Sequence, residues 1–553
     1  MVRQRPEHRR PHDRKDSMTD PTNHRRRRSR LLTLGAVTGT LALTAAGVGV
    51  AQAAAAPPAL SFRASTSAVT AERYEYEGTS WLSFDLGLHV VAGQDAFEIW
   101  AKRTGYDKPI TAERVVTQNG KKKKVALPAG TVTDFWGLKD FTKITIVDEA
   151  GKPVTEYTTA FCGNAWTSAR TRPDAPAANP YPTSCGGYNP FTLGQVWGVQ
   201  AGWSANVPDQ PVYDGTGPEF DLAPGKYTAT ATVNPAYQQM FGIPAASSTA
   251  TVAVTVVDES RGGEAGLLAA RKADTAREPS SAPPLEDEHA LHAGQGDAAR
   301  QVSSYLPEFR APAKRPAGTL KAAPASGPKP DLRSLPAWGI SLSEEEGRTF
   351  INFGATVWNA GTSPLLVDGF RRSGADSGLM DAYQYFFDAK GNQVGSKEAG
   401  TMEWDPREGH KHWHFTDFAQ YNLLAADKAL AVRSGKEAFC LANTDAVDFT
   451  IAGAKWRPEN TSLETSCGAD TVVAVREVLD IGNGDTYTQD RPGQSFEITD
   501  LPNGTYYIEV LANPDNKLAE LSTSNNTALR EVILGGTPDA RTLVVPPVHG
   551  IDG

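Results

Sequence analysis

Short runs of alternating apolar and polar residues recur through most of this 553-residue chain, and they constrain its fold more than any other feature. Clear examples are residues 226–234 (KYTATATVN) and 505–513 (TYYIEVLAN). A period of two places the apolar side chains on one face of a β-strand. Gly, Pro, Asn and Asp, which form turns, bound these runs. The pattern therefore predicts an all-β protein of antiparallel sandwiches.

Sequence landmarks occur in the same order in residues 57–257 and 331–537. Asp221-Leu-Ala-Pro-Gly225 parallels Asp500-Leu-Pro-Asn-Gly504, Phe161-Cys162 parallels Phe439-Cys440, and Thr183-Ser-Cys185 parallels Thr465-Ser-Cys467. A colinear set of this kind indicates a tandem duplication, and hence two antiparallel β-sandwich domains. Between them, residues 258–330 are rich in Ala, Pro, Gly and charge, which predicts a disordered linker. Residues 538–553 are predicted to be a C-terminal tail.

The N-terminus predicts export. Residues 1–30 contain eleven Lys/Arg and four Asp/Glu, and residues 31–53 carry no charge and end in Ala-Gln-Ala. A basic region, an apolar stretch and a small-residue end predict a signal peptide over residues 1–53 rather than a permanent membrane anchor, with twin-arginine export as one route. Its removal changes the net charge from −9 to −16. Such an acidic body disfavours nucleic acid as a partner. We expect a protein secreted to the extracellular space or the cell wall.

Four cysteines form two pairs that are close in sequence. Because disulfides form in exported proteins, we expect Cys162 to bond Cys185 and Cys440 to bond Cys467. Neither pair has the C-x-x-C spacing of a zinc knuckle.

Three of the seven histidines left after the leader fall within one heptapeptide, GHKHWHF. On a strand, His410, His412 and His414 would share one face. A solvent-facing histidine ladder is the alternative interpretation. Three neutral imidazoles with no thiolate or carboxylate suit copper or zinc and leave an open position. Copper is the tighter-binding ion of the two, whereas zinc would imply hydrolysis or hydration.

Motifs along residues 331–537 resemble the lysyl oxidases, a family of copper-dependent amine oxidases. They are Thr356-Val-Trp-Asn-Ala-Gly361, Glu403-Trp404, His410 to Phe418, Lys436-Glu-Ala-Phe-Cys440, Asp485-Thr-Tyr487, and Pro502-Asn-Gly-Thr-Tyr506 followed by Asn513-Pro514 and Asn525-Asn526. This chain departs from the animal members at Asp405, where they have a further histidine. It also has fewer disulfides and a different length between Lys436 and Tyr487.

The resemblance implies copper at the three histidines and a lysine tyrosylquinone cofactor, in which Tyr487 supplies the quinone ring and Lys436 the cross-link. It further implies that a primary amine, either peptidyl lysine or a small amine, is oxidised by dioxygen to an aldehyde, with release of ammonia and hydrogen peroxide. Asp485 and Asp490 lie near the tyrosine, but turn aspartates commonly bind their own backbone. The base is therefore not assigned.

The first domain gives an internal comparison. Alignment on Asp140-Phe141 and Asp417-Phe418 places Thr133, Phe135 and Gly137 opposite the histidines, and alignment on the cysteines places Thr158 opposite Lys436. We therefore expect a degenerate domain that lacks copper ligands and binds a partner or substrate, or shields the active domain. The rival hypothesis for the whole protein is a non-catalytic copper-binding or cell-surface interaction module on the same scaffold.

Overall fold

The computed structural model describes residues 59–76, 79–210, 220–258, 324, 326–374, 378–407, 411–416, 418–434, 438–457, 463–489, 494–538 and 540–552. The predicted leader and most of the predicted linker lie outside these ranges. Strands are the predominant regular structure among the described residues, with one short α-helix and one 3-10 turn, which confirms the all-β class. No helix among them is long and apolar enough to cross a membrane.

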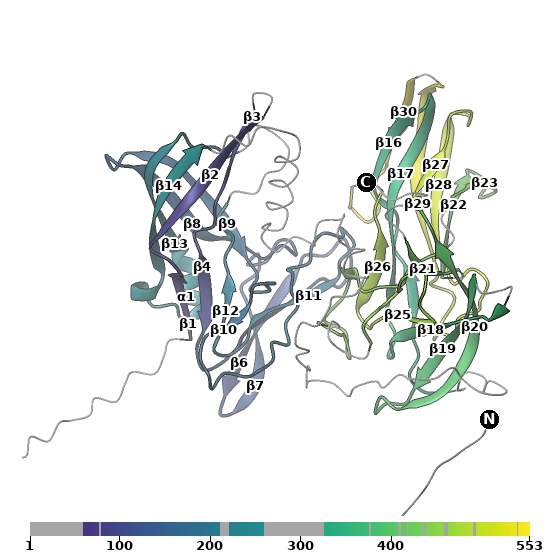
Figure 1. Ribbon diagram of the computed structural model, residues 1–553, viewed down its shortest axis with the longest axis horizontal. Helices are drawn as coiled ribbons and strands as arrows, with labels where there is room; N and C mark the ends of the chain where they lie inside the picture. The colour runs from purple at the N-terminus through teal and green to yellow at the C-terminus, as the bar shows by residue number, and fades with distance from the viewer. Residues whose placement is uncertain are drawn as a thin grey trace, which may run out of the picture. The chain divides into compact units, whose positions relative to one another are not determined.

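The N-terminal domain consists of three sheets (Figure 1). In order across each sheet, the strands are β1 (Leu60–Ala64), β4 (Leu88–Ala92), β12 (Trp203–Asn206) and β10 (Ala169–Arg170); β11 (Gly194–Val199), β5 (Phe97–Lys102), β6 (Thr111–Gln118) and β7 (Lys121–Ala126); and β3 (Thr79–Ser83), β2 (Ala68–Tyr76), β14 (Thr249–Asp258), β13 (Gly225–Val233), β8 (Leu138–Asp148) and β9 (Pro153–Phe161). All pairs are antiparallel except β2 with β14. A short helix, α1 (Pro235–Phe241), follows β13 and is capped by Asn234, and a 3-10 turn, η1 (Ala245–Ser247), precedes β14.

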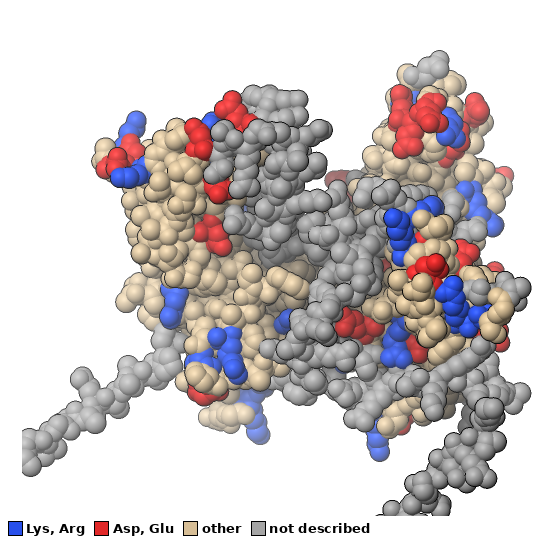
Figure 2. Space-filling model, in the orientation of Figure 1, with Lys and Arg blue, Asp and Glu red and all other residues tan. Residues whose placement is uncertain are grey.

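The C-terminal domain also has three sheets, all antiparallel. They are β15 (Leu332–Ser334), β17 (Arg348–Asn359), β26 (Asn483–Tyr487) and β24 (Asp445–Ala446), with β16 (Trp338–Glu345) and β27 (Ser495–Glu497) also paired to β17; β25 (Ala474–Leu479), β18 (Leu365–Arg371), β19 (Leu379–Phe387), β20 (Gln393–Asp405) and β21 (His412–Phe415); and β23 (Leu430–Arg433), β22 (Ala419–Ala425), β28 (Gly504–Ala512), β29 (Thr527–Thr537) and β30 (Ala540–Val544). Figure 2 shows acidic side chains at the outer end of the β16–β17 hairpin, where Glu344, Glu345 and Glu346 are exposed.

The three sheets of one domain correspond to those of the other in strand order. The series β1-β4-β12-β10, β11-β5-β6-β7 and β14-β13-β8-β9 match β15-β17-β26-β24, β25-β18-β19-β20 and β29-β28-β22-β23. The pairing registers agree as well: Val233 faces Thr142 and Ala512 faces Ala419. These are the residues that the sequence landmarks align. This common topology supports the proposed duplication.

Small details of the backbone also recur. Tyr227 donates its hydroxyl to the Ala223 carbonyl oxygen, and Tyr506 donates to that of Pro502, each at 2.8 Å. Because such a bond ties the start of a strand to the turn before it, both domains fix this corner in the same way. The second domain adds β21 at one edge, the strand that carries two of the three candidate histidines.

Each domain has its own core and its own disulfide. Cys162 is bonded to Cys185 and Cys440 to Cys467, as predicted, with Cα–Cα distances of 5.8 and 6.0 Å. The C-terminal core includes Trp413, Phe415 and Tyr487. The C-terminal domain continues beyond residue 537, since β30 pairs with β29 and Val548 and Ile551 pack in an apolar cluster. The sequence-based boundary therefore divides a hairpin.

Candidate metal and cofactor site

β21 positions two of the three candidate ligands. Its side chains alternate, so that Trp413 and Phe415 enter the core while His412 and His414 lie on the other face. β20 pairs with it, and that register places Asp405 opposite His412. The histidines are 6% and 1% exposed, so the solvent-facing ladder does not describe them.

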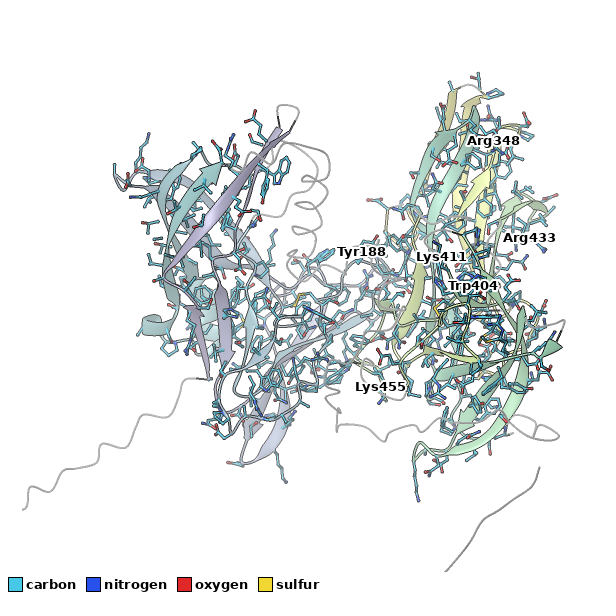
Figure 3. The ribbon with its side chains drawn as sticks, viewed as in Figure 1. Tyr188, Arg348, Trp404, Lys411, Arg433 and Lys455 are labelled. Atoms are coloured by element: carbon cyan, nitrogen blue, oxygen red, sulfur yellow. A yellow bond between two sulfur atoms is a disulfide. The ribbon has the colours of Figure 1, made fainter. Side chains whose placement is uncertain are left out.

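The strand begins at His412, not at His410. Lys411 has a left-handed backbone with φ of +41°, which is uncommon for a residue other than glycine and here marks the turn into β21. Strand alternation places His412 and His414 on one face of β21, and His410 lies outside the described residues. Figure 3 shows Lys411 and Trp404 beside this strand. Among the described residues, no group of three or more His, Cys, Asp or Glu side chains is arranged to hold a metal ion.

The two buried imidazoles face one another. The Nε2 atoms of His412 and His414 are 2.8 Å apart. Two nitrogens that each lie about 2.0 Å from one metal ion, at right angles, are separated by about 2.8 Å. The separation therefore suits two adjacent nitrogen ligands of a square-planar copper ion, and it also suits an N–H···N hydrogen bond in the absence of metal.

A carboxylate lies behind one imidazole. Asp405 Oδ2 is 3.5 Å from His414 Nδ1, and the same carboxylate is held by the Arg407 guanidinium. A carboxylate beside the second nitrogen of a metal-binding histidine fixes the orientation of the ring and makes it a better ligand. Asp405, where the sequence comparison expected a histidine, therefore stands beside a candidate ligand.

Tyr487 lies at the end of β26 inside the core. It is 5% exposed, and its hydroxyl accepts a hydrogen bond from the Cys440 amide at 3.1 Å and donates to the Cys440 carbonyl at 3.3 Å. Phe439 packs against its ring edge-on, with the ring centroids 5.1 Å apart. Burial raises the pKa of the phenol well above its usual range, and the negative charge of Asp485 adds to this shift. The phenol is therefore neutral at physiological pH.

The tyrosine and the histidine strand contact the same segment. Phe415 N and Phe439 N each donate to the carbonyl oxygen of the other, at 2.7 and 3.0 Å, so residues 438–440 run beside β21. Cys440, the next residue, binds Tyr487. Lys436 lies outside the described residues, but it precedes Phe439 by only three positions, which is at most about 11 Å of chain.

One buried carboxyl group near this segment was not foreseen from the sequence. Glu477, which is completely buried on β25, accepts a hydrogen bond from the Leu441 amide at 2.9 Å. Burial raises its pKa well above the usual value, and the nearby charge of Asp485 raises it further. The signal in the sequence was an acidic residue within the apolar run of residues 474–479, but such residues are usually exposed and only packing distinguishes them.

The first domain lacks these groups. Residues 131–137, aligned with the histidines, form no strand, and positive φ angles at Gly130 and Gly137 bound them. The amides of Gly202 and Gly482 donate to corresponding carbonyls, those of Ala92 and Asn359. Val207 lies five residues after Gly202, and Tyr487 lies five residues after Gly482. The position of the candidate cofactor tyrosine is therefore occupied by valine.

The fold and site define a β-sandwich protein in which a buried tyrosine and the strand that carries a buried imidazole pair adjoin the same segment, residues 438–440. Residues 387–540 match the family model for lysyl oxidase. The C-terminal domain is therefore similar to the lysyl oxidase family over these residues.

The curated relatives are animal proteins. The chain is 30% identical to mouse lysyl oxidase homolog 4 over 132 residues, and 28% identical to zebrafish lysyl oxidase homolog 3B and to human lysyl oxidase homolog 3, each over 130 residues. Each match covers 23% of this chain. The chain spans only about 15% of the length of these relatives.

Proposed function

We propose that this protein is a secreted copper amine oxidase that converts primary amines, as peptidyl lysine or small amines, to aldehydes, with dioxygen as the oxidant. Water supplies the aldehyde oxygen by hydrolysis, and ammonia and hydrogen peroxide are the other products. One observation carries the proposal: β21, the strand that carries the buried His412–His414 pair, and the buried Tyr487 ring both adjoin residues 438–440, which lie two to four positions after the candidate cofactor lysine.

His410, His412 and His414 would hold the copper ion, and Lys436 and Tyr487 would form the lysine tyrosylquinone. When present, the copper and the quinone supply the redox chemistry, with the quinone as acceptor of the amine's electrons.

The remaining groups orient the site and exclude water. Asp405 fixes the His414 ring from its Nδ1 side. The Cys440 backbone fixes the Tyr487 hydroxyl, and Phe439 restricts rotation of the ring. The apolar core around Tyr487 keeps bulk water from the ring.

A non-catalytic copper-binding or cell-surface interaction module is the second candidate. The observation in its favour is the enclosure of Tyr487, whose hydroxyl is bonded in both directions to Cys440. A tyrosine held in this way also suits a purely structural role in the core.

Two buried tyrosines make a matched test. Tyr421 and Tyr487 both pack against Phe439, with ring centroids 5.6 and 5.1 Å from it. The full chain is loaded with copper in air, digested and analysed by mass spectrometry, and amine-dependent hydrogen peroxide is measured with a small primary amine and a lysyl peptide. We expect a peptide that joins Lys436 to Tyr487, together with peroxide release, in the wild type and in Tyr421→Phe.

Tyr487→Phe should bind copper normally but form neither the joined peptide nor peroxide. Finding Lys436 and Tyr487 unmodified in copper-replete wild type would refute the oxidase and favour the binding module. Metal analysis of the same samples separates copper from zinc.

A further inference from the structure

We propose that the N-terminal domain positions the strand that carries Tyr487, and that Asn189 is the positioning residue. The expected effect on quinone formation and amine oxidation rests on the proposed function. The contacts between the domains do not depend on that function. They join the two β domains through groups that are mostly buried.

Asn189 reaches from the first domain into the second. It is 1% exposed, and its Nδ2 donates to Thr356 Oγ1 at 2.9 Å and to Asp445 Oδ2 at 2.7 Å. Its Oδ1 accepts from the Phe191 amide, which keeps the side-chain amide in this orientation. The side-chain amide of Asn189 therefore donates both of its hydrogen bonds to the second domain.

The two acceptors converge on the middle residue of the Asp-Thr-Tyr tripeptide. Thr486 Oγ1 lies 2.8 Å from Thr356 Oγ1 and donates to Asp445 Oδ2 at 3.2 Å. Alternation along β26 places Thr486 on the face opposite Asp485 and Tyr487. The first domain thus contacts the Thr486 face of β26, and the opposite face, with Tyr487, packs in the core of the second domain.

Main-chain contacts extend the same support. β24 borders β26, and beyond β24 the amides of Leu193 and Gly194 both donate to the Val447 carbonyl, at 2.7 and 3.2 Å. The Gln195 side chain donates to the Ala446 carbonyl at 2.7 Å. The first domain therefore covers the outer edge of the sheet that contains Tyr487.

Apolar packing fixes this junction. Phe191 is buried in one cluster with Leu335, Trp338, Trp358 and Val447. A second cluster joins residues of both domains: Tyr181, Val196, Phe449 and Ala454, with Trp100 and Trp456 packed against them. Gly194 is a point of close approach, since an added Cβ would lie 2.5 Å from Asp448 Oδ1. Because these groups are closely packed, Asn189 cannot shift relative to Thr356 and Asp445 without disturbing its neighbours. The junction therefore fixes Asn189 relative to β26.

Asn189→Asp tests the proposal because the shape is kept while a donor is replaced by an acceptor facing Asp445. Asn164→Asp is the matched control. Asn164 is also buried, and its three side-chain hydrogen bonds, to Ser184, Val196 and Gly198, remain within the first domain. Both variants are made in the full chain and loaded with copper.

The first measurement is amide hydrogen exchange of Thr486 and Tyr487 in the metal-free protein, which is independent of any activity. We expect Asn189→Asp to accelerate it about tenfold or more, because a buried hydrogen bond to a carboxylate is lost, and Asn164→Asp to leave it unchanged. The second is the yield of quinone, titrated with a carbonyl reagent, and the kcat and KM for a small amine. Asn189→Asp should lower the quinone yield and kcat severalfold, with KM and copper content unchanged.

Equal exchange rates in Asn189→Asp and the wild type, or equal acceleration in both variants, would overturn the positioning role. If Asn189→Asp does not fold, Asn189→Ser, which is too short to reach both acceptors, replaces it with the same expectations. A wild type that forms no quinone refutes the proposed function alone, since the exchange measurement still decides the positioning of β26.

Discussion

The two disulfides allow a matched pair of perturbations. Cys162–Cys185 and Cys440–Cys467 span 23 and 27 residues, and all four cysteines are buried. In the chain-entropy model, loops of these lengths each stabilise the folded state by about 3.5 kcal/mol, and the two values differ by only about 0.1 kcal/mol. Replacing either pair with alanines should therefore lower the free energy of unfolding by nearly the same amount.

The effects on the site should differ. Cys440 binds the Tyr487 hydroxyl through its amide and carbonyl, and the Cys467 carbonyl accepts from the Trp413 amide, between the two described histidines, at 3.0 Å. The corresponding carbonyl in the first domain, that of Cys185, accepts from the Trp197 indole within that domain. Only the second pair is thus bound directly to the candidate site.

The assay combines urea unfolding, copper competition with a chelator and quinone titration on the two double variants. We expect equal losses of unfolding free energy, with weaker copper binding and lower quinone yield only in Cys440→Ala/Cys467→Ala. Equal losses of copper affinity in both variants, or none in either, would refute the assignment of the site to residues 438–440 and β21.

Two further predictions concern buried acids. Asp405→Asn should lower copper affinity about 10–100-fold in chelator competition, since the carboxylate beside His414 Nδ1 is lost. The control variant Arg407→Ala keeps that carboxylate and should bind copper normally. Equal weakening of copper binding in both variants would contradict the reasoning. Burial raises the pKa of Asp480 to about 7, and its side-chain oxygens have no hydrogen-bond partner among the described residues. The folded-state pKa lies above the unfolded value of 3.8, so stability is lost as the pH rises towards 7, by about 1.4 kcal/mol for each pH unit in between. Asp480→Asn should remove this loss in urea unfolding at pH 5 and pH 8, and an unchanged pH dependence would contradict the prediction.

Features that depend on neighbouring residues could be predicted from the sequence. The period of two predicted the strands because burial of one face is a local property. The cysteine spacing predicted both disulfides. The landmark offsets matched the strand registers because duplicated strands must keep their pairing to keep their core.

Features set by tertiary packing could not be predicted. The spacing of the histidines did not reveal that His412 and His414 are buried rather than solvent-facing, because that depends on what packs over β21. The alignment of Thr133 with a histidine did not reveal that residues 131–137 form no strand. Asn189 and Asp445 are 256 positions apart, and no local pattern distinguishes either from an ordinary turn residue.

The coverage of β24 by the first domain has a consequence for how the chain reaches its native state. The first domain is synthesised before residues 445–449, so the edge that pairs with Val447 is already present when they emerge. If the second domain were produced alone, it would expose the main-chain groups of Val447 and Phe449 and the apolar surface around Trp338 and Trp358. Exposed edges of this kind associate with other chains. We therefore expect the second domain produced alone to associate with other chains more readily than the full chain does.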